Sequence, residues 1–368
     1  MLLDTATKFR TMELTIVAPC FNERPNVRPL VQKIAESLKD IEWEIVFVDD
    51  DSPDGTASEV RELAQIDRRV RCVQRIGRKG LSTAVIEGML SSSSPFLAVI
   101  DADMQHDESI LPRMLNELKS GQYDIVVGSR YVDGGDIGDW DQKRAAMSAL
   151  AAKLSRLAIK QDVTDPMSGF FMITRGAFEK SVRKLSGYGF KIMLDLFASA
   201  PEPLRTREIA YTFRTRQFGE SKLDSMVIVE YGMLLIDKMF GGYVPARFVL
   251  FAAIGGLGVF VHLAVLRGAM ASLDFMTSQG IATVAAMTFN FMLNNRLTYR
   301  DRRLRGRKFW LGLLTFYAVC SIGAIANVGI AAKLFEQHYS WLASGIAGIL
   351  VGVVWNYAMS STFTWGKK

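Results

Sequence analysis

The 368-residue chain has few of the residues on which many enzymes and secreted proteins depend. It contains only three cysteines and three histidines. The cysteines are scattered and odd in number, so they predict neither a metal-binding pair nor a disulfide framework, and a reduced environment is the simplest interpretation. The segment from Met1 to Arg10 has no apolar stretch and no small-residue cleavage site, so we expect no secretory signal peptide.

Two common nucleotide-binding motifs are also absent. No Gly-x-Gly-x-x-Gly sequence follows the first predicted strand, and no Gly-x-x-x-x-Gly-Lys-Ser/Thr sequence occurs anywhere. These absences argue against a dinucleotide-dependent enzyme and against a P-loop NTPase. Two of the three histidines, His262 and His338, fall in the apolar C-terminal third, which argues against catalysis by histidine.

Acidic residues are scarce in that last third. Residues 246–368 contain twelve Lys and Arg against three Asp and Glu, a charge of +9, whereas residues 1–245 carry −3. The net charge of +6 therefore comes from a region that is otherwise apolar. This pattern is typical of a membrane domain rather than of a nucleic-acid-binding surface. We expect membrane lipids among the partners, and no nucleic acid.

Four uncharged apolar segments in this region predict four transmembrane helices, at 248–266, 275–293, 309–332 and 341–359. Each is long enough to cross a hydrocarbon core of about 30 Å. The loop at 296–308 carries seven Lys and Arg, whereas the two opposite connections carry only Arg267 and Lys333. The positive-inside rule then predicts a multi-pass protein of the cell (inner or plasma) membrane, with both termini and the N-terminal half in the cytoplasm.

An internal repeat is visible within the predicted helices. Phe289-Asn290-Phe291 aligns with Trp355-Asn356-Tyr357, and Thr298-Tyr299 aligns with Thr364-Trp365 at the same offset. Two helical hairpins in one orientation would be related by a pseudo-twofold axis along the membrane normal. Asparagine is costly when it faces lipid, so we expect these side chains inside the bundle.

The first half of the chain alternates between strand and helix patterns. Five apolar runs read as buried strands, at 14–18, 43–48, 70–73, 96–100 and 125–127. Helical patterns of 10–15 residues separate them, which predicts an α/β fold with a doubly wound parallel sheet. Ligands bind such sheets at the carboxyl ends of the strands. Two amphipathic segments follow: the one at 147–158 favours a core-facing helix, and for 223–240 a core helix and an interfacial helix stay open.

Carboxylates gather at these predicted strand ends. Asp101 and Asp103 alternate in an extended segment and so point the same way, with Gln105 two residues further on. Their oxygens suit Mg²⁺ or Mn²⁺, which usually also hold substrate phosphates. An isolated Asp-x-Asp is more often a solvated loop, but its position at a strand end favours a metal–diphosphate site. The acidic run at 49–51 exceeds what a turn or helix cap needs and could accept hydrogen bonds from a nucleotide.

Seven motifs in a fixed order carry a resemblance to a known family. They are VAPCFNE at 17–23, DDDSPDGT at 49–56, RKGL at 78–81, DADMQH at 101–106, GSRY at 128–131, DPMSGF at 165–170 and GESKL at 219–223. Together they resemble the dolichol-phosphate mannose synthase group of family-2 glycosyltransferases, which have the GT-A fold. The last four predicted helices resemble the GtrA-like membrane proteins. The resemblance implies domains at 1–222 (catalytic) and 246–368 (membrane), joined by an amphipathic linker at 223–245.

The resemblance also implies a reaction: inverting, metal-dependent transfer of a hexose, typically mannose from GDP-mannose, to a polyprenyl phosphate. By matching motif, it implies catalytic roles for Asp103, Arg130 and Arg216, and metal ligation by Asp103, Gln105 and Asp101. It implies acceptor-phosphate binding by Arg130, Arg144 and Ser148. The implied nucleotide-sugar site comprises Pro19, Phe21, Glu23, Val48, Asp50, Asp101, Ala102, Asp103, Gln105, Lys191, Arg216 and Lys222.

Three departures from the family pattern bear on specificity. Cys20-Phe21 replaces a small residue followed by Tyr, Asp51 stands where many members have Gly, and Ser82 stands where many have a second Gly. A glucosyl or other hexosyl transferase that uses a UDP-sugar is therefore an alternative, and a translocase of lipid-linked sugars is another. A processive polysaccharide synthase is disfavoured because no Gln-x-x-Arg-Trp sequence is present. The membrane region could anchor the enzyme, which we favour, flip the product, or form a homo-oligomer.

Overall fold

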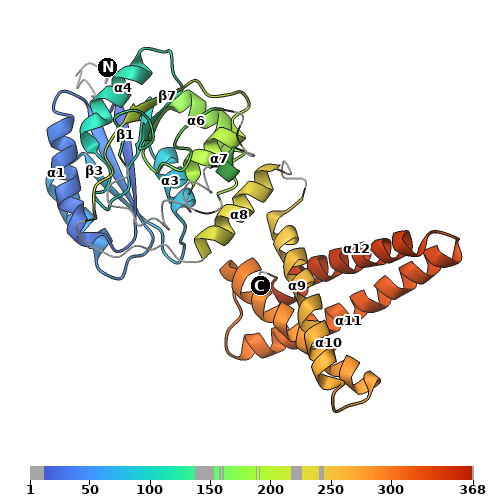
Figure 1. Ribbon diagram of the computed structural model, residues 1–368. Coiled ribbons are helices and arrows are strands. Elements are labelled where there is room, and N and C mark those ends of the chain that lie inside the picture. Colours follow the sequence, from blue (N-terminus) through green and yellow to red (C-terminus); the bar gives the residue numbers. More distant parts are fainter. Residues whose placement is uncertain are drawn as a thin grey trace, which may run out of the picture. The chain divides into compact units, whose positions relative to one another are not determined.

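The structure is a computed structural model that describes residues 12–136, 153–156, 159, 161–187, 189, 191–216, 226–239 and 244–366. The chain divides into two compact units between residues 241 and 242 (Figure 1). The first unit combines a sheet with helices, and the second is helical. Each is described by itself.

A seven-stranded sheet forms the centre of the first unit, with the strand order β3-β2-β1-β4-β6-β5-β7. Its strands are β1 (Leu14–Cys20), β2 (Trp43–Asp49), β3 (Val70–Gln74), β4 (Phe96–Val99), β5 (Ile125–Ser129), β6 (Phe171–Thr174) and β7 (Thr206–Ala210). Strands β3, β2, β1 and β4 run parallel, which confirms the doubly wound core predicted from the sequence.

The prediction of an entirely parallel sheet was wrong at one place. Strand β6 runs antiparallel to both β4 and β5, so the sheet is mixed. Strand β6, four residues long like β4, was not among the predicted strands. Nor was β7, whose Arg207 is exposed and whose flanking residues are only half-buried. An edge strand of this kind lacks the continuous apolar run that marks a central strand.

Helices cover both faces of the sheet because the central strands are apolar on both sides. Along β2, Ile45 and Phe47 join one buried cluster and Val46 and Val48 join the other, as the alternation of side chains along a strand requires. The helices are α1 (Val27–Ser37), α2 (Thr56–Ile66), α3 (Leu81–Leu90), α4 (Leu111–Lys119), α6 (Arg175–Val182), α7 (Ile192–Ser199) and α8 (Met226–Met239), with 3-10 turns η1 (Arg24–Asn26) and η2 (Glu108–Ile110).

Helix α8 occupies most of the second amphipathic segment. Its Leu234 and Leu235 are buried in the cluster that covers one face of the sheet. Lys238 Nζ lies 2.7 Å from the Oδ1 atom of Asp195, a fully buried residue of α7. This face of α8 is therefore a core face. Residues 137–152, which hold most of the other amphipathic segment, lie outside the described residues.

Four long helices build the second unit: α9 (Ala246–Ala269), α10 (Phe275–Leu293), α11 (Arg307–Glu336) and α12 (Trp341–Met359). Short segments η3 (Asn294–Thr298), η4 (Arg300–Arg302) and η5 (Ser360–Thr364) follow α10 and α12. Among the described residues, three helices are long and apolar enough to cross a membrane: α9, α11, and α12 with its η5 extension. The expected count of four is thus met in helices but not in membrane spans. Helix α10 falls short because polar residues such as Gln279 and Asn290 lower its hydropathy.

The contacts in this unit repeat as the sequence repeat predicts. A β-carbon on Gly258 would overlap the Asn290 side chain, and one on Gly323 would overlap that of Asn356, so each hairpin packs an asparagine against a glycine. Both hairpins end in a turn of π-helix, η3 and η5. The rings of Tyr299 and Trp365, equivalent positions in the two repeats, stack with their centroids 4.3 Å apart. The repeated sequence therefore builds a repeated structure.

Candidate active site

The carboxyl ends of three neighbouring strands meet at one edge of the sheet in the first unit. Strand β1 pairs with β2 on one side and with β4 on the other. The segments that follow these strands, at 21–23, 50–55 and 100–106, therefore lie side by side. This is the convergence of polar residues that the sequence predicts, at the edge where open α/β sheets bind ligands.

The three acidic residues at the end of β2, Asp49 to Asp51, differ in their surroundings. Asp49 is buried and accepts hydrogen bonds from the backbone and hydroxyl of Ser52. Asp50 accepts a 2.6 Å hydrogen bond from the Gly80 amide and lies 3.1 Å from the guanidinium of buried Arg75. Burial raises the pKa of Asp50. Asp51 has φ +60°, the left-handed conformation that favours glycine, which accounts for the glycine common at this position in the family that the sequence resembles.

The other predicted nucleotide-site residues around β1 and β2 are partly structural. Pro19 and Val48 are register partners on the two strands, and Val48 is fully buried in the core. The side chain of Val48 therefore packs inside the protein, and a ligand could reach only its backbone. The ring of Phe21 lies under the ammonium group of Lys79, 3.9 Å from its centroid. Glu23 accepts a 2.8 Å hydrogen bond from Asn26.

Asp101, Asp103 and Gln105 lie in the turn after β4, not in the extended segment that the sequence predicts. The backbone N–H of Gln105 donates a 3.1 Å hydrogen bond to Asp103 Oδ1, and the intervening Met104 has φ +64°. Ala102 is buried. Burial, followed by repulsion from Asp103, raises the pKa of Asp101 to about 7. A carboxylate with a raised pKa beside a second carboxylate favours a cation as a ligand, because the cation relieves the repulsion.

The oxygens of this turn converge on one positively charged atom. Arg216 Nη2 lies 2.5 Å from Asp103 Oδ2 and 3.5 Å from Gln105 Oε1. Two oxygens that face the same cationic nitrogen are also disposed to face a hard divalent cation, and carboxylate and amide oxygens are suitable ligands. Among the described residues, no group of three or more His, Cys, Asp and Glu side chains could hold a metal. The predicted set of two carboxylates and one amide fits Mg²⁺ or Mn²⁺ only with further oxygens from water or substrate.

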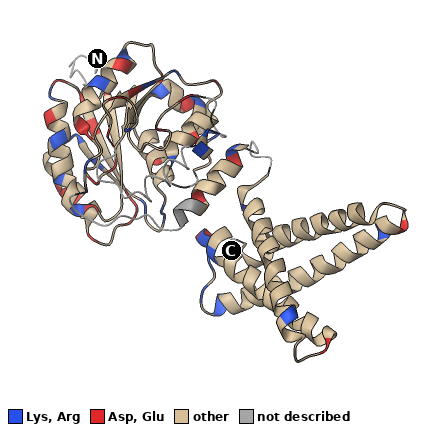
Figure 2. Ribbon diagram, viewed as in Figure 1, with Lys and Arg blue, Asp and Glu red and all other residues tan. Residues whose placement is uncertain are grey.

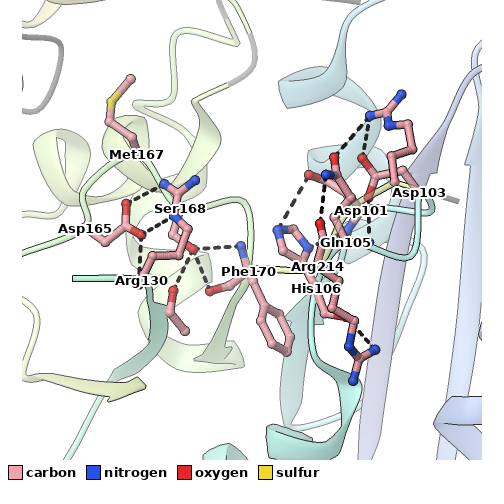
Figure 3. A network of polar contacts seen from close by, with 12 residues as sticks. Asp101, Asp103, Gln105, His106, Arg130, Asp165, Met167, Ser168, Phe170 and Arg214 are labelled. Atoms are coloured by element: carbon pink, nitrogen blue, oxygen red, sulfur yellow. Dashed lines mark hydrogen bonds and ion pairs between the residues drawn. The ribbon is translucent and has the colours of Figure 1, made fainter. Parts of the chain in front are cut away.

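Two residues without a predicted role hold this turn in place. His106 is buried, stacks on Phe170 with ring centroids 5.2 Å apart, and accepts a 3.2 Å hydrogen bond at Nδ1 from the Asp101 amide. Burial lowers the pKa of His106 to about 4, so the ring is neutral at pH 7. Arg214 pairs with Asp107 and Glu108 at 2.7 and 2.6 Å. Figure 3 shows both beside the Asp101–Gln105 turn.

Arg130, a predicted catalytic residue, lies in a second polar group that Figure 3 shows on the other side of Phe170. Its Nε and Nη2 atoms form a bidentate pair with Asp165 at 2.7 and 2.8 Å. Asp165 is fully buried, and its own amide donates to Glu208 over 3.2 Å. Asp165 lies in one of the seven motifs, but its role could not be predicted, because no local pattern links it to Arg130, 35 positions away.

The remaining predicted site residues divide into one that is described and three that are not. Lys191 Nζ donates a 2.9 Å hydrogen bond to the Met167 carbonyl. Its charge lowers the pKa of Asp101, against the larger effect of burial, so Lys191 lies near this turn, and its role in binding the donor stays a prediction. Arg144, Ser148 and Lys222 lie outside the described residues, and their roles stay predictions.

Comparison with known proteins finds relatives of both units. The model of glycosyl transferase family 2 matches residues 15–182, and that of the GtrA/DPMS transmembrane domain matches residues 250–365. A dolichol-phosphate mannosyltransferase of Pyrococcus furiosus is 32% identical over 96% of this chain and 99% of its own length. The Saccharomyces cerevisiae protein of that name is 34% identical over 60% of this chain and 85% of its own.

Solved structures show weaker similarity. The crystal structure of glucosyl-3-phosphoglycerate synthase from Mycobacterium tuberculosis, in complex with Mn²⁺, UDP-glucose and phosphoglyceric acid, is 17% identical. The aligned part covers 61% of this chain and 80% of that one, with a TM-score of 0.44.

Proposed function

The chain belongs to the dolichol-phosphate mannosyltransferase family, a group of family-2 glycosyltransferases, and we propose that it transfers mannose from GDP-mannose to a polyprenyl phosphate. The relatives that share nearly its whole length or its catalytic unit carry that name. The match to a GtrA/DPMS transmembrane domain supports a substrate carried in the bilayer. The proposed reaction inverts the anomeric centre and depends on a divalent cation.

The convergence of Asp103 and Gln105 on one cationic atom is the observation that supports this proposal best. In the proposed reaction, Asp103, Gln105 and Asp101 would hold Mg²⁺ or Mn²⁺. Such a cation, when bound, stabilises the negative charge that develops on the leaving nucleoside diphosphate. Arg216 would then turn from Asp103 to the diphosphate oxygens, where a guanidinium forms paired hydrogen bonds.

The acceptor needs orientation more than activation. A lipid monophosphate has a second pKa of about 6 and is largely ionised at pH 7, so no strong general base is required. His106 could not serve as one, because it is buried and its pKa is about 4. In the proposed site Arg130 binds the acceptor phosphate, and its pairing with Asp165 fixes the plane of the guanidinium before the substrate arrives.

A panel of substrates tests the proposal. Purified full-length protein in detergent is incubated with labelled GDP-mannose, UDP-glucose or another UDP-hexose, and with dolichyl or undecaprenyl phosphate. We expect mannose on the lipid phosphate with inverted anomeric configuration, loss of transfer in EDTA, and recovery with Mg²⁺ or Mn²⁺. Preferential transfer from a UDP-sugar would overturn the donor assignment, and transfer that persists in EDTA would overturn the metal site.

We also propose that the catalytic unit lies on the cytoplasmic side of the cell membrane. The second unit is a membrane domain of the GtrA/DPMS type, and its basic loop at 296–308 supports this orientation by the positive-inside rule. Protease accessibility of a tag at each terminus, in intact and in opened cells, measures the orientation. Cleavage of either tag in intact cells would contradict the proposal.

A further inference from the structure

The loop between α10 and α11 gathers most of the positive charge of the membrane unit. Figure 2 shows the helices of this unit almost without charge and blue residues on this loop. Seven Lys and Arg and only one acid, Asp301, lie between 296 and 308. Six of these cations are exposed, and we name them the basic platform: Arg296, Arg300, Arg303, Arg305, Arg307 and Lys308.

The loop that carries the basic platform is fixed at its base. Asn295 Oδ1 accepts a 2.8 Å hydrogen bond from the Leu304 amide, and Asn295 Nδ2 donates over 3.1 Å to the Leu304 carbonyl. The same oxygen accepts a 3.0 Å hydrogen bond from Trp365 Nε1. Asn295 is 4% exposed and Trp365 is fully buried. The buried side chain of Asn295 thus binds both backbone groups of Leu304 and joins the loop to the second repeat. We call this set of contacts the Asn295 clasp.

Two further contacts involve Asp301, the one acidic residue of the loop, and Arg302, the one cation of the loop that is not in the platform. Asp301 lies 3.0 Å from Arg247 Nη2 at the start of α9. Arg302 points toward the Trp365 carbonyl, 3.4 Å away. The loop therefore lies at the N-terminal end of α9. The acid that could neutralise the platform is already paired with Arg247.

Large apolar side chains are exposed next to the platform. Trp310, two residues after Lys308, is 65% exposed, and Phe363, two residues before Trp365, is 68% exposed. Exposed aromatic rings beside clustered cations are typical of the boundary between hydrocarbon and head groups. The platform is thus next in sequence to residues of the kind found at that boundary.

Orientation in the membrane alone does not explain this construction. The positive-inside rule depends on the number of Lys and Arg near the helix ends, and a loosely held loop would satisfy it equally well. A buried clasp instead fixes the positions of the charges. We infer that the basic platform is a binding surface for the phosphate head groups of anionic lipids. Two sources share that chemistry, the phosphomonoester of a polyprenyl phosphate and the phosphodiester of an acidic phospholipid, and the former rests on the proposed function.

Binding to short-chain lipids tests this inference. The full-length protein in neutral detergent micelles is titrated with farnesyl phosphate, dihexanoyl-phosphatidylglycerol or dihexanoyl-phosphatidylcholine, and affinity is measured by microscale thermophoresis. A micelle does not separate two aqueous compartments, so the orientation of the protein in a membrane cannot affect the measured affinity. Any binding of farnesyl phosphate in the catalytic unit is common to all variants, and transfer activity is not measured. A failure here is therefore separate from a failure of the proposed reaction.

Matched variants isolate the platform. Arg303→Gln with Arg305→Gln should weaken binding of an anionic probe about tenfold. Arg267→Gln with Lys333→Gln, which removes two charges elsewhere in the same unit, should change affinity by less than about twofold. Asn295→Ala keeps every charge but removes the clasp, and it should weaken binding about threefold.

The pattern of results decides the inference. Weaker binding of farnesyl phosphate alone identifies a site for the acceptor lipid, and weaker binding of phosphatidylglycerol alone identifies a site for phospholipid. Either result supports a surface for lipid phosphate. Equal effects of the two charge-pair variants, or none, would overturn the inference. Unchanged binding in folded Asn295→Ala would also overturn it, because diffuse attraction to a loop of any conformation would then suffice.

Discussion

The two units of the molecule use buried polar residues in opposite ways. In the catalytic unit each polar contact occurs once: Asp103 faces Arg216, and Asp165 holds Arg130. In the membrane unit the packing of asparagine on glycine occurs twice, since Asn290 packs on Gly258 as Asn356 packs on Gly323. A contact without a duplicate should be costly to lose. The loss of one of two duplicated contacts should lower stability less, because the other contact remains.

The largest effect is expected at the unduplicated turn after β4. Asp103→Ala removes the carboxylate that, with Gln105, faces a single cationic atom. We expect transfer to fall about a thousandfold, because stabilisation of the leaving diphosphate by a cation amounts to several kcal/mol. The initial rate with GDP-mannose and a polyprenyl phosphate measures this. Asp40→Ala, on the exposed surface of the same unit, is the control and should keep full activity.

The next largest effect is expected at the pair of Arg130 and Asp165. Asp165→Asn leaves a buried guanidinium without its carboxylate, which should lower the free energy of unfolding by about 3 kcal/mol. The melting temperature in detergent measures the loss. Among proteins that remain folded, KM for the lipid phosphate should rise while KM for the donor stays unchanged.

A surface pair with the same chemistry provides the control for that variant. Asp124 also forms a bidentate pair, with Arg205, but Arg205 is 58% exposed. Asp124→Asn should change the melting temperature far less, because water can solvate the remaining guanidinium. Equal losses from the two variants would contradict the view that burial makes the Asp165 contact irreplaceable.

In both units, the sequence predicts the elements and the chemical motifs better than it predicts the contacts between distant residues. Five strands, the turn at Asp101–Gln105 and the internal repeat could all be read from it, because each rests on neighbouring residues or on a fixed spacing. The antiparallel β6 could not, since its direction depends on the strands between which it lies. Nor could the pairing of Arg130 with Asp165. Such a partner is set by the fold, and no local pattern identifies it.

A smaller effect concerns the pH dependence of stability at the same turn. The pKa of Asp101 is raised to about 7, so between pH 4 and 7 this group alone makes stability fall as pH rises, because the folded state binds the extra proton. The pKa of His106 is lowered to about 4, so between pH 4 and 6.5 it alone makes stability rise with pH. The two slopes oppose each other in the native protein.

Single substitutions should therefore reveal slopes of opposite sign. In Asp101→Asn the melting temperature should rise with pH from 4.5 to 6.5, with His106 contributing up to about 1.4 kcal/mol per pH unit. In His106→Gln it should fall over the same range. Profiles that shift in parallel with the native one would show that neither group titrates as its surroundings indicate.

The smallest effect is expected in the membrane unit, where contacts are duplicated. Gly258→Ala and Gly323→Ala each place a β-carbon against an asparagine side chain, and at Gly323 the Trp355 ring also lies 3.1 Å from that β-carbon. Each should cost only about 1 kcal/mol, the low end for an overfilled contact, and the two should lower the melting temperature by similar amounts.

The double variant should show an additive loss, because the contacts lie in different hairpins. Gly255→Ala, where a β-carbon meets nothing within 4 Å, is the control. If the two single variants lower the melting temperature by unequal amounts, the two hairpins contribute differently to stability, although they repeat in sequence and in structure.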